Sequence, residues 1–272
     1  MNNFYIKKRF YRIKNWLFRY FRKLVIKLFY IDKKNLSRKL TKYHKTHFEN
    51  ISFVRLNNFD ISVVIPCYNH AEYLDSVFSS IINQTYRPFE VIFVEDNSTD
   101  ETLEKLHDLC QILPKGIKYK LLRTRKNSGQ CRAINLGVSK TNSSIIMVLN
   151  DDDYLMHDAI EVALQIIKSQ KDIYLLGSTC VQFSGTGKPC TSDNLYIYNI
   201  VEYSKIHLRK IYPSETIRIN DRNDINLTHS GSVFLRNAWN SVGGYQPHLM
   251  KRVLKYSDRD FQLKIASLYP IA

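Results

Sequence analysis

Residues 61–95 read ISVVIPCYNHAEYLDSVFSSIINQTYRPFEVIFVE, with two short runs of β-branched residues on either side of an amphipathic segment. The first run, residues 61–66, ends in proline and predicts a buried strand, and the run at 90–95 predicts a second one. The apolar residues between them have the i, i+3, i+4, i+7, i+8 spacing of one helix face: Leu74, Val77, Phe78, Ile81 and Ile82. This order of strand, helix and strand is typical of a parallel βαβ unit.

The same alternation continues on the C-terminal side of this unit. Apolar runs predict strands at residues 118–123, 144–149 and 173–178, and amphipathic segments predict helices after residue 100 and at 130–139 and 157–168. We therefore expect an α/β fold for residues 60–272, with a largely parallel sheet and helices on both faces. Ligands of such sheets bind beyond the carboxyl ends of the strands. Between about residue 180 and residue 224 the pattern weakens and assigns no element.

The charge of the chain is unevenly distributed. The 272 residues have a formal net charge of +15, but residues 1–50 contain 15 Lys and Arg against two acids, while the other residues contain 25 basic and 23 acidic groups. The excess charge belongs to the N-terminal segment and not to the domain, which argues against nucleic acid as a partner of the domain. A nucleic-acid-binding protein with a basic arm is the alternative, and it leaves the aspartates described below unexplained.

Residues 4–30 combine basic and aromatic residues in a helical pattern. Apolar side chains recur every three or four residues, and nine Lys and Arg occur in this segment without an acid. Such a helix suits the surface of an anionic membrane, where each basic residue contributes on the order of 1 kcal/mol. Packing on the domain or on a partner is the alternative. Residues 31–59 are polar and are interpreted as a linker, so residues 1–50 form a basic helix and linker.

Cysteine usage and hydropathy indicate the cellular compartment in which the protein resides. Five scattered cysteines without a CxxC pair indicate neither a disulfide framework nor a zinc site, and they favour a reducing compartment. No run of 18 apolar residues predicts a membrane span, and the N-terminal segment is a poor signal peptide. We therefore expect a cytoplasmic protein that lies peripherally on the inner face of the membrane through residues 4–30.

Polar residues follow three predicted strands at the point where each one ends. These are residues 66–69 (PCYN), 95–98 (EDNS) and 150–153 (NDDD). In a parallel sheet the three loops meet at one edge. Three consecutive carboxylates at the mouth of an apolar core repel one another, and Mg²⁺ or Mn²⁺ relieves this repulsion through oxygen ligands. The alternative is a solvated turn that caps the following helix.

Asp96 stands directly at the end of the second strand. Its carboxylate can accept a hydrogen bond from a nucleobase or a ribose, whereas capping of the following helix needs only one side chain from residues 97–100. The alternative for Asp96 is a turn residue that is solvated by water.

In this order, the motifs resemble those of family-2 glycosyltransferases of the GT-A fold. Residues 61–102 are similar to the opening of that family, and residues 127–137 (NSGQCRAINLG) and 145–160 (IIMVLNDDDYLMHDAI) resemble its next two blocks. Residues 231–261 resemble its acceptor-side block. Four blocks in the right order are far more specific than a single pair of aspartates.

The resemblance implies an inverting transferase that binds a nucleoside diphosphate sugar, most often a UDP-sugar. The segment of Pro66, Cys67 and Tyr68 corresponds to the part that lines the base and ribose, and Asp96 with the adjacent Asn97 corresponds to the residues that hold the base. The implied acceptor is a hydroxyl of a glycan or a lipid-linked sugar, in the synthesis of cell-envelope or surface polysaccharide.

The resemblance also implies roles for the aspartates. Asp152 and Asp153 correspond to ligands of a divalent cation that bridges the two phosphates, and Asp151 corresponds to a contact with the nucleotide. The cation acts as a Lewis acid toward the leaving diphosphate. Asp258 matches the catalytic base, which contributes about 10²–10⁴-fold in rate.

From the residues alone, Asp258 is instead the cap of a helix at 259–266. The apolar face of that helix is expected to contain Phe261, Ile265 and Leu268. In the same block, His229 either touches the donor phosphates or is a structural histidine. Trp239 and Tyr245 either stack on a sugar or, as we expect for Trp239, belong to the core.

Several positions depart from the family pattern. Asn150 replaces the first Asp of the metal motif, Ser257 replaces the Glu before the base, and residues 246–248 (QPH) replace an acidic pair. The chain ends 14 residues after Asp258, where family members commonly continue, so a C-terminally truncated member is expected. A catalytically impaired homologue that still binds the nucleotide sugar is the alternative to an active transferase.

Overall fold

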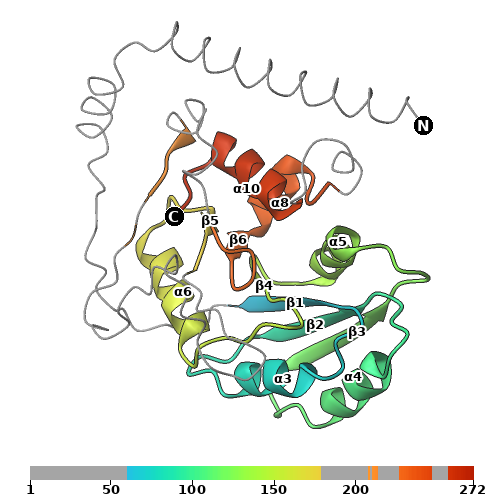
Figure 1. The fold of residues 1–272 in the computed structure, drawn as a ribbon. Helices are drawn as coiled ribbons and strands as arrows, with labels where there is room; N and C mark the ends of the chain where they lie inside the picture. Colours follow the sequence, from blue (N-terminus) through green and yellow to red (C-terminus); the bar gives the residue numbers. More distant parts are fainter. Residues whose placement is uncertain (1–59, 179–207, 209, 214–226, 247–256) are drawn as a thin grey trace, which may run out of the picture. The chain divides into compact units, whose positions relative to one another are not determined.

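The computed structural model describes residues 60–178, 208, 210–213, 227–246 and 257–272 (Figure 1). The basic helix and linker predicted within residues 1–59 lie outside the described residues, so both stay predictions. Within the described part, no helix has the length and apolar character that a membrane crossing requires.

The elements follow one another as the sequence predicts up to α6. The strands are β1 (Ile61–Cys67), β2 (Glu90–Glu95), β3 (Lys118–Arg123), β4 (Ile145–Val148), β5 (Leu175–Leu176) and β6 (Val233–Leu235). The helices are α3 (Leu74–Ile82), α4 (Thr102–Gln111), α5 (Gln130–Lys140), α6 (Ala159–Ser169), α8 (Arg236–Val242) and α10 (Ser257–Leu268). The predicted βαβ unit is confirmed as β1, α3 and β2.

The strands form one sheet in the order β3-β2-β1-β4-β6-β5. β1 pairs in parallel with β2 and β4, and β2 pairs in parallel with β3. β6 runs antiparallel to both β4 and β5. The predicted α/β fold with a largely parallel sheet is confirmed. The sequence does not predict β6, because three residues are too few to show a periodic pattern.

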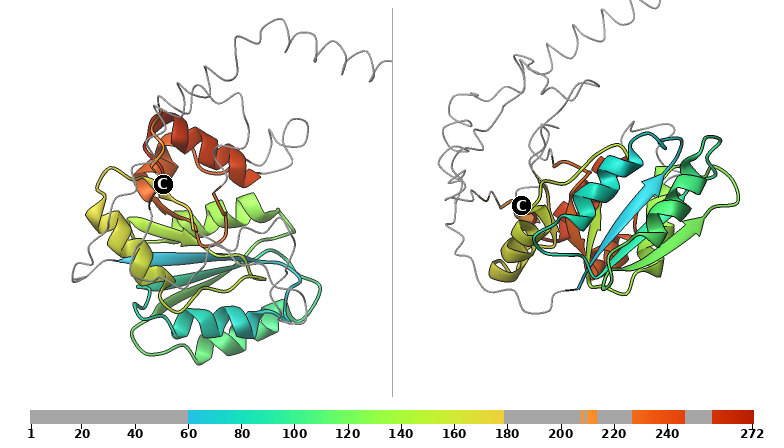
Figure 2. Two further views of the ribbon diagram at one scale, coloured as in Figure 1. Left: turned by 60° about the vertical axis from the view of Figure 1, so that its left-hand side comes forward. Right: turned by 90° about the horizontal axis from the view of Figure 1, so that it is seen from below.

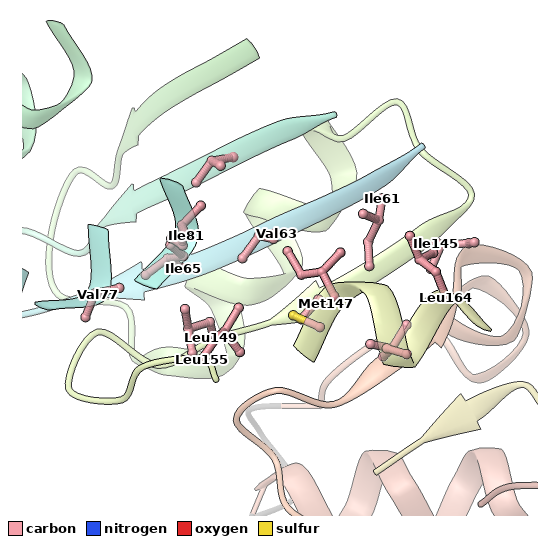
Figure 3. Close-up of a cluster of buried hydrophobic side chains, with 14 of the residues drawn as sticks. Ile61, Val63, Ile65, Val77, Ile81, Ile145, Met147, Leu149, Leu155 and Leu164 are labelled. Atoms are coloured by element: carbon pink, nitrogen blue, oxygen red, sulfur yellow. The ribbon is translucent and has the colours of Figure 1, made fainter. Parts of the chain in front are cut away.

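Helices α3, α4 and α6 cover one face of the sheet (Figure 2). Alternate residues of β1, namely Ile61, Val63 and Ile65, point into this layer, where Val77 of α3 and Leu164 of α6 pack against them (Figure 3). Each of these side chains is at most 1% exposed, and burial of one such side chain stabilises the fold by about 1.5–3 kcal/mol. The strand ends are therefore anchored in a tightly packed layer.

Helices α5, α8 and α10 cover the opposite face. Val64 of β1 and Val94 of β2 point toward α5, where Gly137 lets the helix approach the sheet closely. A Cβ atom at Gly137 would overlap Cγ1 of Val64 and lie 3.0 Å from Cγ2 of Val94. Phe261 of α10 packs edge-to-face on Phe234 of β6, with ring centroids 5.1 Å apart. This second layer holds α5 and α10 directly on the sheet.

Two predictions on the C-terminal side are wrong in part. The strand predicted at residues 173–178 contains only Leu175–Leu176, which pair with β6 rather than extend the parallel part of the sheet. Leu268 is 55% exposed and does not join the apolar face, because α10 ends at this residue and Ala266 takes the buried position of its last turn. Trp239 is half-buried and packs against the core, as expected.

Candidate active site

Asp151 joins the loop after β4 to the loop after β1. Its Oδ2 accepts a hydrogen bond from the main-chain N–H of Tyr68 at 2.9 Å, and its Oδ1 lies 2.8 Å from Nδ1 of His70. Asp151 is only 6% exposed. Both carboxylate oxygens are therefore bound by the loop that follows β1, and the predicted meeting of these two strand ends is confirmed.

The loop after β2 joins the same edge. The main-chain N–H of Asn69 donates to Oγ of Ser98 at 3.1 Å, and the main-chain N–H of Thr99 donates to Oδ1 of Asn69 at 2.8 Å. Asn69 and Asn97 adopt φ angles of 54° and 60°, a left-handed conformation that asparagine tolerates better than most residues. These two asparagines turn the chain at the ends of β1 and β2, which places the predicted site residue Asn97 at the joined edge.

Asp96 is 3% exposed and is bound by the loop between β3 and α5. Its Oδ1 accepts hydrogen bonds from Oγ1 of Thr124 at 2.6 Å and from the main-chain N–H of Ser128 at 2.9 Å. Its Oδ2 accepts from the main-chain N–H of Gly129 at 2.7 Å. The alternative of a water-solvated turn residue is wrong, because the carboxylate is buried and paired. Contact between Asp96 and a nucleobase stays a prediction.

Three potential metal ligands gather at the joined ends of β1 and β4. A ring nitrogen of His70 and carboxylate oxygens of Asp151 and Asp152 lie within 4.8 Å of one another. Ligands at about 2.1 Å from one Mg²⁺ or Mn²⁺ ion lie at most about 4.2 Å apart, so the group is close to the size that such an ion requires. The prediction from sequence does not include His70, although its place in the loop directly after β1 is a signal that points to it.

Asp153 makes different contacts, through Asn150. Oδ2 of Asp153 accepts a hydrogen bond from Nδ2 of Asn150 at 3.1 Å, and Oδ1 of Asn150 accepts one from Nε2 of Gln130 at 2.9 Å. Because an ionised carboxylate only accepts hydrogen bonds, Asp153 determines the orientation of the Asn150 amide. An Asp at position 150 would bring two carboxylates together. The departure from the family pattern at Asn150 therefore has a local structural reason.

Burial and hydrogen bonding shift the pKa values of the joined pair. Burial lowers the pKa of His70, but the hydrogen bond and the charge of Asp151 outweigh this effect, so the pKa of His70 is raised. Burial raises the pKa of Asp151 by more than its hydrogen bonds with His70 and Tyr68 lower it. Both groups hold a proton more tightly than in the unfolded chain, so a cation binding there competes with protons.

The segment predicted to line the nucleotide is the end of β1. Pro66 is buried, and Cys67 is 0% exposed with its side chain in the apolar layer beneath the sheet. Burial, followed by the charge of Asp151, raises the pKa of the Cys67 thiol well above its usual value. Tyr68 is 39% exposed. A contact between Cys67 and a ligand is therefore limited to the backbone, whereas Tyr68 presents its side chain to the surface.

The predicted base, Asp258, lies in the first turn of α10 and is half-buried. It is near His229, whose Nε2 lies 3.1 Å from the hydroxyl oxygen of Tyr245. Burial lowers the pKa of His229, and the negative charges of Asp258 and Asp153 oppose this shift. His229 is therefore affected by the negative charge of both the predicted base and the loop after β4, residues 150–153, which we call the aspartate loop.

A surface hollow of about 520 Å³ lies between α3 and α4. It contains none of the predicted site residues, and its lining residues are Asp75, Glu101, Glu104, Lys105, Asp108, Leu109 and Ile112. Lys105 pairs with Asp75 across it. We interpret this hollow as the solvated surface of two amphipathic helices and assign no ligand to it.

Comparison with known proteins gives a family match over most of the domain. The family described as Glycosyl transferase family 2 matches residues 62–242, which is more than half of the chain. An uncharacterized glycosyltransferase of Haemophilus influenzae is 34% identical over 107 residues, which cover 39% of this chain and 42% of that protein. The chondroitin synthase of Pasteurella multocida is 27% identical over 231 residues, 85% of this chain and 20% of the synthase. The chain therefore spans less than half the length of these relatives.

Solved structures show the same fold. TarS 1–349 of S. aureus, solved in complex with UDP, has a TM-score of 0.56 and 19% identity, covering 76% of this chain and 55% of that one. The mannosyltransferase PcManGT from Pyrobaculum calidifontis, solved with GDP-Man and Mn²⁺, has a TM-score of 0.59 and 17% identity, covering 84% and 57%. At these identities the likeness shows the fold alone, and the GT-A fold expected from the motifs is confirmed.

Proposed function

The chain belongs to glycosyl transferase family 2, and we propose that it moves a sugar from a nucleoside diphosphate sugar to a hydroxyl of a glycan or lipid-linked acceptor. The observation that carries this proposal is the joining of three polar strand ends at one edge of the sheet, through Asp151 and Asn69. Such an edge is where parallel sheets bind nucleotides. It also combines fixed main-chain groups with exposed carboxylate, which a diphosphate and its counter-ion require.

We infer that a divalent cation, Mg²⁺ or Mn²⁺, is held by Asp152 together with Asp151 and His70. These three residues offer one nitrogen and carboxylate oxygens within 4.8 Å of one another. When bound, the cation supplies Lewis-acid stabilisation of the charge on the leaving diphosphate. Asp153 lies outside this group and pairs with Asn150. We therefore propose that Asp153 orients the loop after β4 on the side of the site next to His229.

The nucleoside is proposed to lie along the ends of β1 and β2. Tyr68 offers an exposed ring there, and Asp96 fixes the loop at Ser128 and Gly129 against the end of β2. Asn97, which is half-buried, contributes its left-handed turn beside Asp96. We propose UDP as the nucleotide, since TarS 1–349, which has the same fold, is solved in complex with UDP. A GDP-sugar is the alternative donor, because the mannosyltransferase is solved with GDP-Man.

Asp258 is the proposed general base. Its carboxylate takes the proton of the acceptor hydroxyl as the acceptor oxygen forms a bond to the anomeric carbon of the donor sugar. The bond between that carbon and the diphosphate oxygen breaks on the opposite side, which inverts the anomeric centre. General-base catalysis of this kind contributes about 10²–10⁴-fold.

The acceptor and the location of the protein are proposed on separate grounds. The matches to chondroitin and hyaluronan synthases of Pasteurella multocida support a glycan acceptor and a role in surface polysaccharide synthesis. The basic amphipathic pattern of residues 4–30 supports peripheral binding to the cytoplasmic face of a membrane. Flotation with anionic lipid vesicles tests the latter: full-length chain should float, and a chain without residues 1–50 should stay at the bottom. Equal flotation of both contradicts the membrane role.

The activity is tested by release of the nucleoside diphosphate from a panel of UDP- and GDP-sugars, with Mn²⁺ and with EDTA. We expect release from one sugar nucleotide in Mn²⁺ and none in EDTA. A chain that binds the sugar nucleotide but never turns it over is the catalytically impaired homologue, which the replacements at Asn150 and Ser257 favour. A chain that binds no sugar nucleotide contradicts the proposed function.

A further inference from the structure

His229 is attached to the aspartate loop by its own turn. The main-chain N–H of Gly231 donates to the carbonyl of Val148 at 2.8 Å, at the end of β4. The main-chain N–H of Asn150 donates to Oγ of Ser230 at 3.1 Å. These bonds connect the turn of His229 to β4 on one side, and β6 follows this turn directly. The histidine therefore has a fixed position beside the three consecutive aspartates.

His229 is also attached to the helix that carries the predicted base. Its ring meets the ring of Tyr245 edge-to-face with centroids 5.6 Å apart, and its Nε2 lies 3.1 Å from the Tyr245 hydroxyl. Tyr245 stacks on Phe261 with centroids 4.1 Å apart and an interplanar angle of 16°. Phe261 lies one turn after Asp258 on α10. The chain of contacts therefore runs from the aspartate loop to the predicted base.

The burial of Tyr245 determines which nitrogen of His229 carries the proton. Tyr245 is 1% exposed, and within the described residues its hydroxyl has Nε2 of His229 as its partner. Burial raises the pKa of Tyr245, so the phenol stays protonated, and burial lowers the pKa of His229 against the charges of Asp258 and Asp153, so the ring is neutral. A buried O–H donates when an acceptor is in reach. Nε2 therefore accepts, and Nδ1 carries the hydrogen.

The chemistry around Nδ1–H selects its ligand. Among the described residues, no hydrogen bond is formed by this donor. It lies in the field of two carboxylates, Asp153 and Asp258, which repel a phosphate but not a neutral oxygen. A neutral N–H in such surroundings suits a sugar hydroxyl. We propose that His229 is a substrate-binding residue whose Nδ1–H donates to a sugar hydroxyl between the aspartate loop and Asp258, an inference that rests on the proposed function.

Two variants separate this role from a structural one. In His229→Asn the amide nitrogen can take the place of Nδ1, whereas in His229→Gln the side-chain oxygen can keep the bond from Tyr245 but no donor remains at the Nδ1 position. We expect His229→Gln to lower kcat/KM by about tenfold, the usual effect of one lost substrate hydrogen bond, and His229→Asn to recover most of that loss. Affinity for UDP, which lacks the transferred sugar, should be unchanged in both variants.

The source of the hydroxyl follows from which Michaelis constant changes. A higher KM for the sugar nucleotide, seen also in its hydrolysis without acceptor, assigns the donor sugar. A higher KM for the acceptor alone assigns the acceptor sugar. Tyr245→Phe, which keeps the ring stack on Phe261 but frees the tautomer, should raise the same KM by a few-fold and serves as the second variant if His229→Gln folds poorly.

Three outcomes overturn the inference. The first is wild-type kinetics in His229→Gln and Tyr245→Phe. The second is an equal loss in the Asn and Gln variants together with weaker UDP binding and a lower melting temperature, which is the pattern of a structural histidine. The third is a wild-type chain that binds no sugar nucleotide, which overturns the proposed function itself and is thereby distinguished from the other two.

Discussion

The main-chain N–H of Tyr68 donates to Oδ2 of Asp151 at 2.9 Å, and 83 positions separate the two residues in the sequence. This bond ties the end of β1 to the end of β4, two adjacent parallel strands in the middle of the sheet. Because both strands are anchored in the packed layers on either side, the carboxylates after β4 are held in place before any ligand arrives. Preorganised groups lose little entropy when a substrate binds.

Replacement of the predicted base should separate chemistry from binding. Asp258→Asn keeps the shape of the side chain but removes the proton acceptor, so we expect kcat to fall by about 10²–10⁴-fold with little change in sugar-nucleotide affinity. Asp260→Asn is the matched control, since Asp260 lies on the same turn of α10 and pairs with Lys264 at 2.6 Å. Steady-state kinetics and calorimetry measure the two effects. Equal rates for the two variants would contradict the role of Asp258.

Asp96 should matter for stability as well as for ligand binding. In Asp96→Asn an amide NH₂ replaces one carboxylate oxygen that accepts from the main-chain N–H groups of Ser128 and Gly129. A buried donor without an acceptor costs about 1–3 kcal/mol, so the free energy of unfolding in urea should fall by this amount. Asp108→Asn, at an exposed position of α4, is the control. An Asp96 variant as stable as the control would mean that these hydrogen bonds contribute nothing net.

The close approach of α5 to the sheet gives a third prediction. Gly137→Ala puts a methyl group against Val64 and Val94, both of which are 0% exposed. Overpacking of this kind costs about 1–3 kcal/mol, measured as a lower denaturant midpoint. Ser139→Ala on the exposed side of the same helix serves as the control. If Gly137→Ala stabilises the chain, as Gly-to-Ala changes do in open helix positions, the described contact is not formed.

The pair of His70 and Asp151 predicts a pH dependence of stability. Burial lowers the pKa of His70, but Asp151 raises it by more, so the folded ring binds its proton more tightly than the unfolded one. The pair therefore stabilises the fold below a pH of about 6.5 and loses this contribution as the pH rises through the raised pKa. The half-exposed ring limits the effect to about 1 kcal/mol or less.

This dependence is measured in EDTA as the difference in unfolding free energy between the wild type and His70→Gln. The difference should be larger at pH 6 than at pH 9, because the neutral glutamine cannot form the charged pair. A difference that is constant with pH, or that grows as the pH rises, would show that His70 is not protonated beside Asp151.

The sheet could be predicted well from the sequence where its strands are central. β2 has the predicted bounds, β1 extends one residue further than predicted, and β4 is one residue shorter at each end, because strands buried on both faces are continuous apolar runs. The partly exposed edge strand β3 also has the predicted bounds. β5 and β6 could not be predicted in this way. Their two and three residues owe their conformation to antiparallel pairing with each other and with β4, and no local pattern records such pairing.

The site could be predicted in its residue types but not in its contacts. The three polar strand ends indicated where side chains would meet, yet the partners of Asp151 are 81 and 83 residues away. The 81 positions between His70 and Asp151 explain why the sequence does not predict His70. Asp96 fits a solvated turn in the sequence because its partners Thr124 and Gly129 are 28 and 33 positions away. Asn150 stood out as a departure from the family, and only its bonds to Gln130 and Asp153 show what the amide does.

The central claim is that one cation at Asp152 links the chain to the diphosphate of its donor. Calorimetric titration of UDP in Mn²⁺ and in EDTA tests it most directly, with Asp152→Asn beside the Asp260→Asn control. The account predicts UDP binding at least about tenfold tighter in Mn²⁺ for the wild type and the control, and no difference between Mn²⁺ and EDTA for Asp152→Asn. Full Mn²⁺ dependence in Asp152→Asn, or none in the wild type, would contradict it.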